Sequence, residues 1–312
     1  MNNGFTTFSR RDCNYGMNAF TIKDLENLTG IKAHTIRIWE QRYNFLKPQR
    51  TETNIRYYTN EELKTVLNIA LLNKYGYKIS HIDRMDAAEM QQRILQLTDT
   101  QAVQERNVNE LVQEMIDLKV DQIDRVLGEH FEQKGVERTV LKLIFPFLEK
   151  IGILWLTGHI NPAQEHLVTN VIRQKLLVAL DRTPLPVNSK QLVMLFLPEG
   201  EYHELGLLFL NYLMKSRGIA TIYLGANVPI KDVAYVVRLK QPAIIFSHLT
   251  STASNFSMEK FLNKISLHFA GTPTVVSGSQ TLYYKKAIPS GVSFKQSLSE
   301  VMDLITEISL KN

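Results

Sequence analysis

The stretch that decides the fold is QLVMLFLPEGEYHELG, residues 191–206, in which an apolar run passes directly into a polar loop. The run has the length and composition of a buried strand. The loop carries His203, with Glu201 two residues before it and Gly206 three residues after it. A lone histidine is more often a surface or core residue than a ligand, so the surrounding sequence has to decide its role.

The sequence after this stretch alternates between short β-rich apolar runs and helical segments. The next apolar runs are ATIYLG, AIIFSHL and TPTVVSG. Apolar strands alternating with helices predict a parallel sheet covered on both faces. We therefore expect residues 184–312 to form a doubly wound, Rossmann-like domain that binds ligands beyond the carboxyl ends of its strands. Two further candidate groups, Ser247-His248-Leu249 and Gly278-Ser279, each follow such a strand.

The middle of the chain, residues 89–183, has the periodicity of helices. Apolar residues recur three and four apart, as in Leu111, Met115 and Leu118. The helical stretches are DAAEMQQRILQLTDT, VNELVQEMIDLKVDQIDRVLGEHFEQKG, VERTVLKLIFPFLEKIGILWLTGHI and NPAQEHLVTNVIRQKLLVALDR. These stretches predict a four-helix bundle, and the following DRTPLPVNSK, with two prolines, indicates a linker. The chain as a whole is expected to be a multidomain protein of α and α/β parts.

The N-terminal section, residues 18–88, is expected to be a winged helix-turn-helix. A helix from about Ile22 to Leu28, a turn at Thr29-Gly30 and a second helix from about Ala33 to Tyr43 give the required spacing. The second helix displays side chains that can reach base edges and phosphates: His34, Thr35, Arg37, Gln41 and Arg42. The polar RTETNIRYYT that follows, with Arg50, Arg56, Tyr57 and Tyr58, is suited to a wing against the DNA backbone.

The charge distribution supports a polyanionic partner for this section. The net charge is +5, and residues 1–85 hold 13 Lys/Arg against 8 Asp/Glu, while the remainder is balanced at 23 of each. The lone Cys13 excludes an intrachain disulfide, and no apolar run approaches the length needed to span a bilayer. We therefore expect a cytoplasmic protein without a membrane partner, in which residues 1–17 form a disordered tail.

The run TIRIWEQRYNFLKPQRTETNIRYYTNEEL, residues 35–63, resembles the MerR-type winged-helix DNA-binding domain. That pattern is a helix-turn-helix, then Arg-Tyr-x-x-Leu-x-Pro-x-Arg, then a wing that ends Arg-x-Tyr. The resemblance implies contacts to operator DNA from Arg37, Arg42, Arg50, Arg56 and Tyr57. Packing between helix and wing is the main role expected for Trp39 and Tyr43, and Tyr43 is also counted among the candidate DNA contacts.

EYHELG resembles the Asp-x-His-x-x-Gly signature of cobalamin-binding domains, and the later groups resemble their Ser-x-Leu and Gly-Gly elements. The resemblance implies that His203 ligates cobalt, with Glu201 holding the other ring nitrogen, although glutamate is one methylene longer than the usual aspartate. Gly206 would leave room for the corrin ring. The other residues implied in cofactor binding are Ser247, Leu249, Gly278 and Ser279, of which Ser247 and Gly278 would line the slot for the nucleotide tail.

WLTGHINPAQEH, residues 155–166, completes a resemblance to the cobalamin-dependent, light-responsive MerR-type repressors, the CarH/LitR group. In that group a Trp-x9-Glu-His element caps the upper face of adenosylcobalamin. By resemblance, Trp155 would pack on the adenosyl group, Glu165 would hydrogen-bond it, and His166 would line the same pocket. Photoreceptors of the group carry histidine directly after the tryptophan, whereas this chain has Leu156, with His159 about one helical turn further on.

The sequence is therefore interpreted as that of a transcriptional regulator whose operator binding depends on adenosylcobalamin or another cobalamin. It is expected to be a repressor and not an enzyme. Cofactor held between the bundle and the Rossmann-like domain would assemble protomers into a dimer or tetramer that presents several winged helices to one operator. Two alternatives stay open. One is a regulator of the same architecture that does not use cobalamin, and the other is a corrinoid carrier for methyl transfer, against which the basic winged helix argues.

Overall fold

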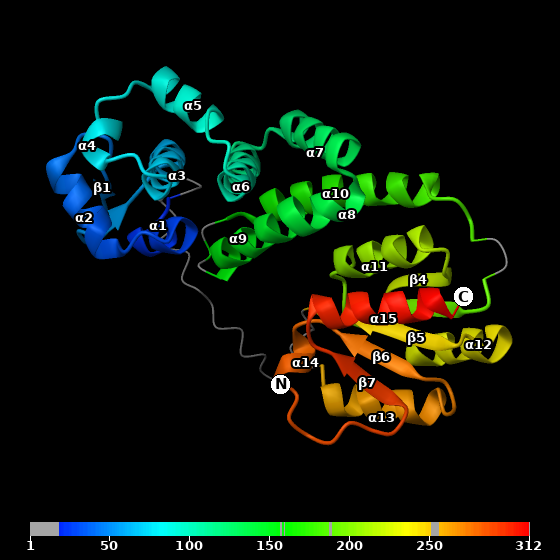
Figure 1. Ribbon diagram of the computed structural model, residues 1–312. Helices are drawn as coiled ribbons and strands as arrows, with labels where there is room; N and C mark the ends of the chain where they lie inside the picture. The colour runs from blue at the N-terminus through cyan, green and yellow to red at the C-terminus, as the bar shows by residue number, and fades with distance from the viewer. Residues whose placement is uncertain (1–18, 157, 159, 187–188, 251–255, 312) are drawn as a thin grey trace. The chain divides into compact units, whose positions relative to one another are not determined.

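The fold is taken from a computed structural model, which describes residues 19–156, 158, 160–186, 189–250 and 256–311 (Figure 1). The chain forms two compact units, residues 1–171 and residues 172–312. Each unit is considered by itself. The expected N-terminal tail, Cys13 and His159 lie outside the described residues.

The winged-helix section begins with two short helices at the predicted positions, α1 (Ile22–Thr29) and α2 (Ala33–Arg42). Helix α1 starts at a capping box, because the Thr21 side chain accepts from the Asp24 amide while the Asp24 carboxylate accepts from the Thr21 amide. It ends at Gly30, whose φ of 75° is the left-handed conformation that favours glycine. The expected turn between the helices is therefore confirmed.

Aromatic packing fixes α2 against the remainder of this section. Trp39 is buried, and its ring meets the ring of Phe45 edge-on at a centroid distance of 5.9 Å. Tyr43 stacks on Phe45 at 5.6 Å. The core around Trp39 is completed by residues of the following helices: Ile69, Leu71, Leu72, Ile82, Met85 and Ile94. Trp39 and Tyr43 thus pack against Phe45 and the section that follows the wing, and the packing between helix and wing expected of them stays a prediction.

The wing is a two-stranded antiparallel hairpin, β1 (Gln49–Arg50) and β2 (Arg56–Tyr57). Asn54 takes a φ of 65° at its tip, a conformation that asparagine tolerates better than most residues. Helix α3 (Asn60–Lys74) follows, capped by Thr59 and Glu62, and then come α4 (Ile79–Ile82) and α5 (Ala87–Leu95).

The helical section contains α6 (Thr100–Ile116), α7 (Val120–Lys134), α8 (Val136–Thr139), the π-helical η1 (Val140–Ile144), α9 (Phe145–Leu156) and α10 (Pro162–Arg182). The sequence interpretation joined residues 108–135 into one helical stretch, and this was wrong. The chain breaks between α6 and α7, where Leu118 takes a φ of 56°. Asp117, which ends α6, pairs with Lys64 of α3 at 2.6 Å and with Lys119 at 3.2 Å, and these contacts hold the break.

A buried polar contact joins α9 to α6. The Lys150 ammonium donates to the Asn109 side-chain oxygen at 2.7 Å. Asn109 is buried, and burial lowers the pKa of Lys150 from 10.5 to about 8, because desolvation penalises the charged form. Lys150 is one residue of a pocket of about 270 Å³ lined by α1, α3, α6 and α9.

The C-terminal unit is built on a five-stranded parallel sheet of order β4-β3-β5-β6-β7. Its strands are β3 (Leu192–Pro198), β4 (Ala220–Val228), β5 (Ile244–His248), β6 (Thr274–Ser277) and β7 (Val292–Lys295). The helices between and after them are α11 (Leu205–Ser216), α12 (Ile230–Lys240), α13 (Met258–His268), α14 (Gln280–Tyr283) and α15 (Leu298–Leu310). The doubly wound domain is confirmed, with β7 and α15 added to the four strands expected.

The strand order places the candidate residues. Helices α11 and α15 cover one face of the sheet, and α12 and α13 cover the other (Figure 1). From β3 the chain runs to β4 on one side of it, and it then returns to β5 on the other side of β3. The strand order therefore reverses between β3 and β5. A doubly wound sheet opens its ligand crevice at this point, beyond the carboxyl ends of the strands. His203 follows β3 and Ser247 lies at the end of β5, so both belong to this edge.

Candidate nucleic-acid interface and cofactor site

The second helix of the winged-helix section presents a polar, exposed face. His34, Arg37 and Gln41 are spaced by three and four residues, so they share one side of α2, and all three are exposed. Arg42 is exposed at the end of the helix, and Thr35 is half-buried. Ile36 and Trp39 on the opposite side are buried. A helix with a packed inner face and a donor-rich outer face can enter a major groove.

The wing carries its own polar side chains. Arg50 is exposed and donates to the side-chain oxygen of Asn54 at 2.7 Å across the tip of the hairpin. Tyr57 donates its hydroxyl proton to Gln49 on the facing strand. The rest of the turn is closed by backbone bonds, with the Thr51 amide donating to the Ile55 carbonyl at 2.9 Å. The hairpin thus holds a guanidinium at its tip.

Arg56 makes a contact within the protein in addition to the DNA contact that was expected of it. Its Nε lies 3.2 Å from Oε2 of Glu40 on α2, and the other oxygen of Glu40 accepts from the Tyr58 hydroxyl. Burial and this carboxylate raise the pKa of Tyr58, which is fully buried. Arg56 therefore ties the wing to the second helix, and its DNA contact stays a prediction.

His203 is held by Glu201 in the arrangement that a metal ligand needs. Nδ1 of His203 lies 2.7 Å from Oε1 of Glu201, and the His203 amide donates to the same oxygen at 2.9 Å. The Thr250 amide donates to Oε2 at 3.1 Å. The Glu201 side chain is fully buried, while the His203 side chain is 57% exposed. Because a carboxylate only accepts, Nδ1 carries the proton in this contact, and Nε2 is the ring nitrogen that a neutral imidazole would offer to a metal.

The β5 and β6 ends supply the other candidate residues. Ser247 is fully buried, and its Oγ has no hydrogen-bond partner among the described residues. Gly278 has a φ of 97°, and a Cβ there would lie 2.3 Å from the Leu249 carbonyl oxygen. Leu249 is fully buried in the core of the sheet, and its expected part in cofactor binding stays a prediction. Ser279 is exposed and donates to the Thr250 carbonyl at 2.6 Å.

Sequence reasoning missed the role of His248. Its Nδ1 lies 2.8 Å from the Ser277 hydroxyl, and its ring fills the space that a Cβ at Gly206 would need, 2.6 Å from Cδ2. Burial lowers the pKa of His248 from 6.5 to about 4. The absence of a Cβ at Gly206 therefore makes room for the His248 ring, whereas it was expected to make room for a corrin ring. No pattern along the chain indicates this contact, because it joins residues 42 positions apart.

The Trp-Glu-His element lies where one helix ends and the next begins. Trp155 is in the last turn of α9 and is 49% exposed. Helix α10 starts at Pro162, as expected, and the Ala163 amide donates to the Asn161 side chain at 2.8 Å. Glu165 and His166 follow in the first turns, with their side chains 3.0 Å apart. His166 is the more exposed of the two, so it is open to a ligand.

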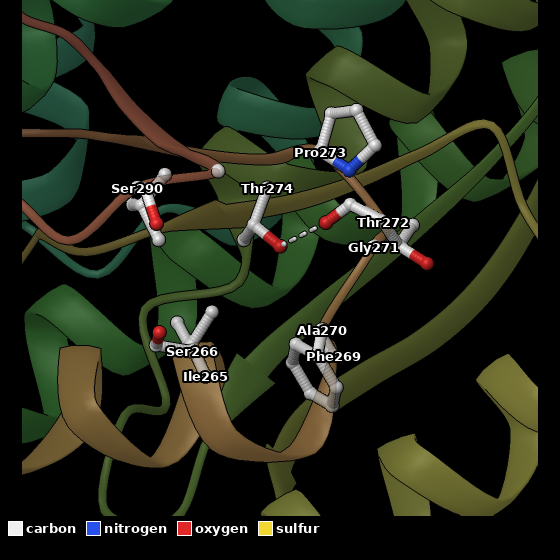
Figure 2. Close-up of a pocket in the computed structure, with 11 residues that line it drawn as sticks. Ile265, Ser266, Phe269, Ala270, Gly271, Thr272, Pro273, Thr274 and Ser290 are labelled. Carbon is white, nitrogen blue, oxygen red and sulfur yellow. Dashed lines mark hydrogen bonds between the residues drawn. The ribbon is translucent and has the colours of Figure 1, made fainter.

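A pocket of about 160 Å³ lies elsewhere in the C-terminal unit (Figure 2). It is formed by the end of α13, the start of β6 and the turn before β7, with Phe269, Pro273 and Val292 among its walls. Thr274 uses its hydroxyl to bond the Thr272 carbonyl at 3.3 Å. Since the amino ends of the strands form the edge opposite His203, this pocket is separate from the candidate cofactor site. In the described part of the chain, no helix is both long and apolar enough to cross a bilayer.

The residues at the carboxyl edge of the sheet fit a cobalamin on structural grounds. The exposed imidazole edge is oriented by a buried carboxylate, as for an axial metal ligand. The Ser247 hydroxyl is a buried polar atom that finds no hydrogen-bond partner within the described part of the chain, although such groups normally have one. Both lie at the point where the strand order reverses.

Comparisons with known proteins assign a domain type to two segments of the chain. The family model for the MerR HTH family regulatory protein matches residues 20–89, and that for the B12 binding domain matches residues 108–179. The chain is 27% identical over 291 residues to the HTH-type transcriptional repressor CarA of Myxococcus xanthus, covering 92% of this chain and 96% of the relative. It is 26% identical over 267 residues to the repressor CarH of the same organism, covering 83% and 89%.

A solved structure shares the fold of about two thirds of the chain. The monomethylamine corrinoid protein of Methanosarcina barkeri superposes with a TM-score of 0.51 at 14% identity, covering 64% of this chain and 96% of that protein. At this identity the likeness concerns the fold alone. The two family models and the two relatives show that this chain combines a segment of the MerR HTH type with a segment of the B12 binding domain type and is similar over most of its length to the CarA and CarH transcriptional repressors.

Proposed function

We propose that the protein is a DNA-binding repressor whose operator affinity is controlled by cobalamin, with adenosylcobalamin as the active form. The observation that carries the cofactor part is the His203–Glu201 pair, in which a buried carboxylate leaves Nε2 of an exposed imidazole ready to bind a metal. The observation that carries the DNA part is the donor-rich face of α2 beside a preformed wing.

In the cofactor site, His203 would bind the cobalt through Nε2. Glu201 would keep the imidazole in the tautomer that binds and would raise its donor strength. The Ser247 hydroxyl would meet a polar atom of the cofactor's nucleotide tail, which would give this buried group its missing hydrogen bond. Bound cobalamin would supply a cobalt centre that accepts a protein ligand and, in its adenosyl form, a cobalt-carbon bond that light can break.

Three residues of the helical section would contact the adenosyl group. Trp155 offers a half-exposed ring for packing, and Glu165 and His166 offer polar groups in the first turns of α10. Leu156 follows Trp155 and has no atom that can bind cobalt, so the proposed light response draws no cobalt ligand from that position.

Control of DNA binding would come from association of protomers in the cytoplasm. A dimer or tetramer presents several winged helices to one operator, and linked readers gain about 10²- to 10⁴-fold in affinity without any new base contact. The cofactor has to favour the associated state, because a ligand with equal affinity for both states shifts nothing.

The test uses purified full-length protein mixed with adenosylcobalamin in the dark. We expect a bound corrinoid spectrum with histidine ligation, a larger species in size-exclusion chromatography, and tight binding to DNA selected from a random pool. Green light should reverse the last two. His203→Ala should abolish the histidine-ligated spectrum, while the matched variant His268→Ala, which changes an exposed histidine on α13, should behave as the wild type.

Two results would contradict the proposal. Protein that acquires no corrinoid spectrum but still binds DNA would indicate a regulator of this architecture that does not use cobalamin. Protein that loads cobalamin but binds the selected DNA equally well with and without it would separate the cofactor from the control of transcription.

A further inference from the structure

A three-residue cluster lies directly beside the proposed cobalt ligand. Glu204, the residue after His203, pairs with Nη2 of Arg173 on α10 at 3.3 Å. The other oxygen of Glu204 accepts from the Tyr223 hydroxyl of β4 at 2.7 Å. The cluster therefore joins the His203 loop to a helix and to an edge strand.

The Glu204 carboxylate does not cap the helix that follows it. Glu204 is the N-cap residue of α11, where an acidic side chain normally bonds the first free amides of the helix. Its side chain makes no such bond and is turned to Arg173 and Tyr223 instead. The Glu204 side chain is only 17% exposed, and burial together with the carboxylate raises the pKa of Tyr223. The Arg173 side chain is 41% exposed, so solvent is kept from the carboxylate side of the contact and reaches the guanidinium side.

Helix α10 is attached to α11 at a second point. The Lys215 ammonium, near the end of α11, donates to the Leu180 carbonyl of α10 at 3.0 Å. Two contacts, one at each end of α11, therefore attach the second half of α10 to α11. Arg173 lies seven residues after His166, so the two side chains leave α10 on the same face, about 10 Å apart along the helix axis.

We propose that Arg173 is a positioning residue that acts on His203 through Glu204, so that the cobalt-ligand loop moves with the helix that carries Glu165 and His166. This inference rests on the proposed function. Glu201 sets the orientation of the imidazole within the sheet edge, and Arg173 sets the place of the whole loop relative to α10.

The first test needs no cofactor. Arg173→Met removes the charge and keeps the length of the side chain, and Arg182→Met makes the same change at an exposed position in the last turn of α10. In ligand-free protein we expect amide hydrogen exchange in residues 201–208 to become about three- to tenfold faster in Arg173→Met, the range for loss of one contact of ordinary hydrogen-bond strength. Arg182→Met should match the wild type, and Arg173→Lys should restore part of the protection.

The second test follows the absorbance of adenosylcobalamin on titration into each protein. Arg173→Met and Glu204→Gln should each lower the fraction of cobalt ligated by histidine by about three- to tenfold, and the double variant should be no worse than either, because both break one contact. If Arg173→Met does not fold, Glu204→Gln and Arg173→Lys carry the same comparison. Histidine ligation and exchange that are unchanged in folded Arg173→Met would overturn the inference. Wild-type protein without histidine ligation would instead overturn the proposed function.

Discussion

Acid should destabilise the C-terminal unit through His248. Its pKa falls from 6.5 to about 4 on folding because the ring is desolvated against Gly206 and Ser277. Between these values the unfolded chain binds a proton that the folded chain does not, so stability falls as the pH drops from 6.5 toward 4 and then levels off. At pH 4.5 the two pKa values correspond to a loss of about 2.5 kcal/mol relative to pH 7.5.

The assay is urea unfolding at each pH, followed by hydrogen exchange of peptides from β3 and β5, which report opening of this unit. His248→Asn keeps a polar partner for the Ser277 hydroxyl but removes the titrating group, so its stability should fall about 2.5 kcal/mol less than that of the wild type between pH 7.5 and 4.5. His268→Asn, at an exposed position, should follow the wild type. An imidazole resonance of His248 that titrates between pH 6 and 7, or a His248→Asn curve parallel to the wild-type curve, would refute the reasoning.

Three other outcomes are expected. Gly206→Ala should cost about 1–3 kcal/mol in urea unfolding, because its Cβ would meet the His248 ring at 2.6 Å. Lys150→Met should remove a pH-dependent gain in stability that the wild type shows. The buried amine of the wild type, with its pKa lowered to about 8, loses its proton between pH 7 and 9.5, before the unfolded chain does, and this raises the free energy of unfolding by about 2 kcal/mol. Thermal unfolding at both pH values measures the gain. Arg37→Ala and Arg50→Ala should each weaken DNA binding and reduce the slope of log affinity against log salt by about 1, as measured by fluorescence anisotropy; an unchanged slope would exclude a phosphate contact.

Sequence patterns predicted those elements in which a continuous or regularly spaced set of apolar residues coincides with a buried face. The continuous apolar run before Pro198 and the capped helix ending at Gly30 are local signals, and the structure contains both elements. The break at Leu118 was missed because the apolar spacing continues through it. The strand Val292–Lys295 was missed because it is only four residues long and half-buried, so it gives no sustained apolar run.

The candidate site was predictable only in part. The Glu201–His203 bond joins residues two apart, so a motif can contain it. The contact of His248 with Gly206 and the pair of Arg173 with Glu204 join residues that are distant in sequence, and they depend on how the elements pack. Such pairings follow from tertiary packing, which a single sequence does not reveal.

The carboxylate of Glu40 receives both Arg56 and Tyr58, and this shared acceptor makes the DNA-reading head a preformed rigid body. Hairpin and recognition helix cannot shift against each other without leaving a buried polar group unpaired. A signal from elsewhere in the protein is therefore poorly placed to act by reshaping the head. Under the proposed function, it would act instead on the number and spacing of complete heads along the double helix.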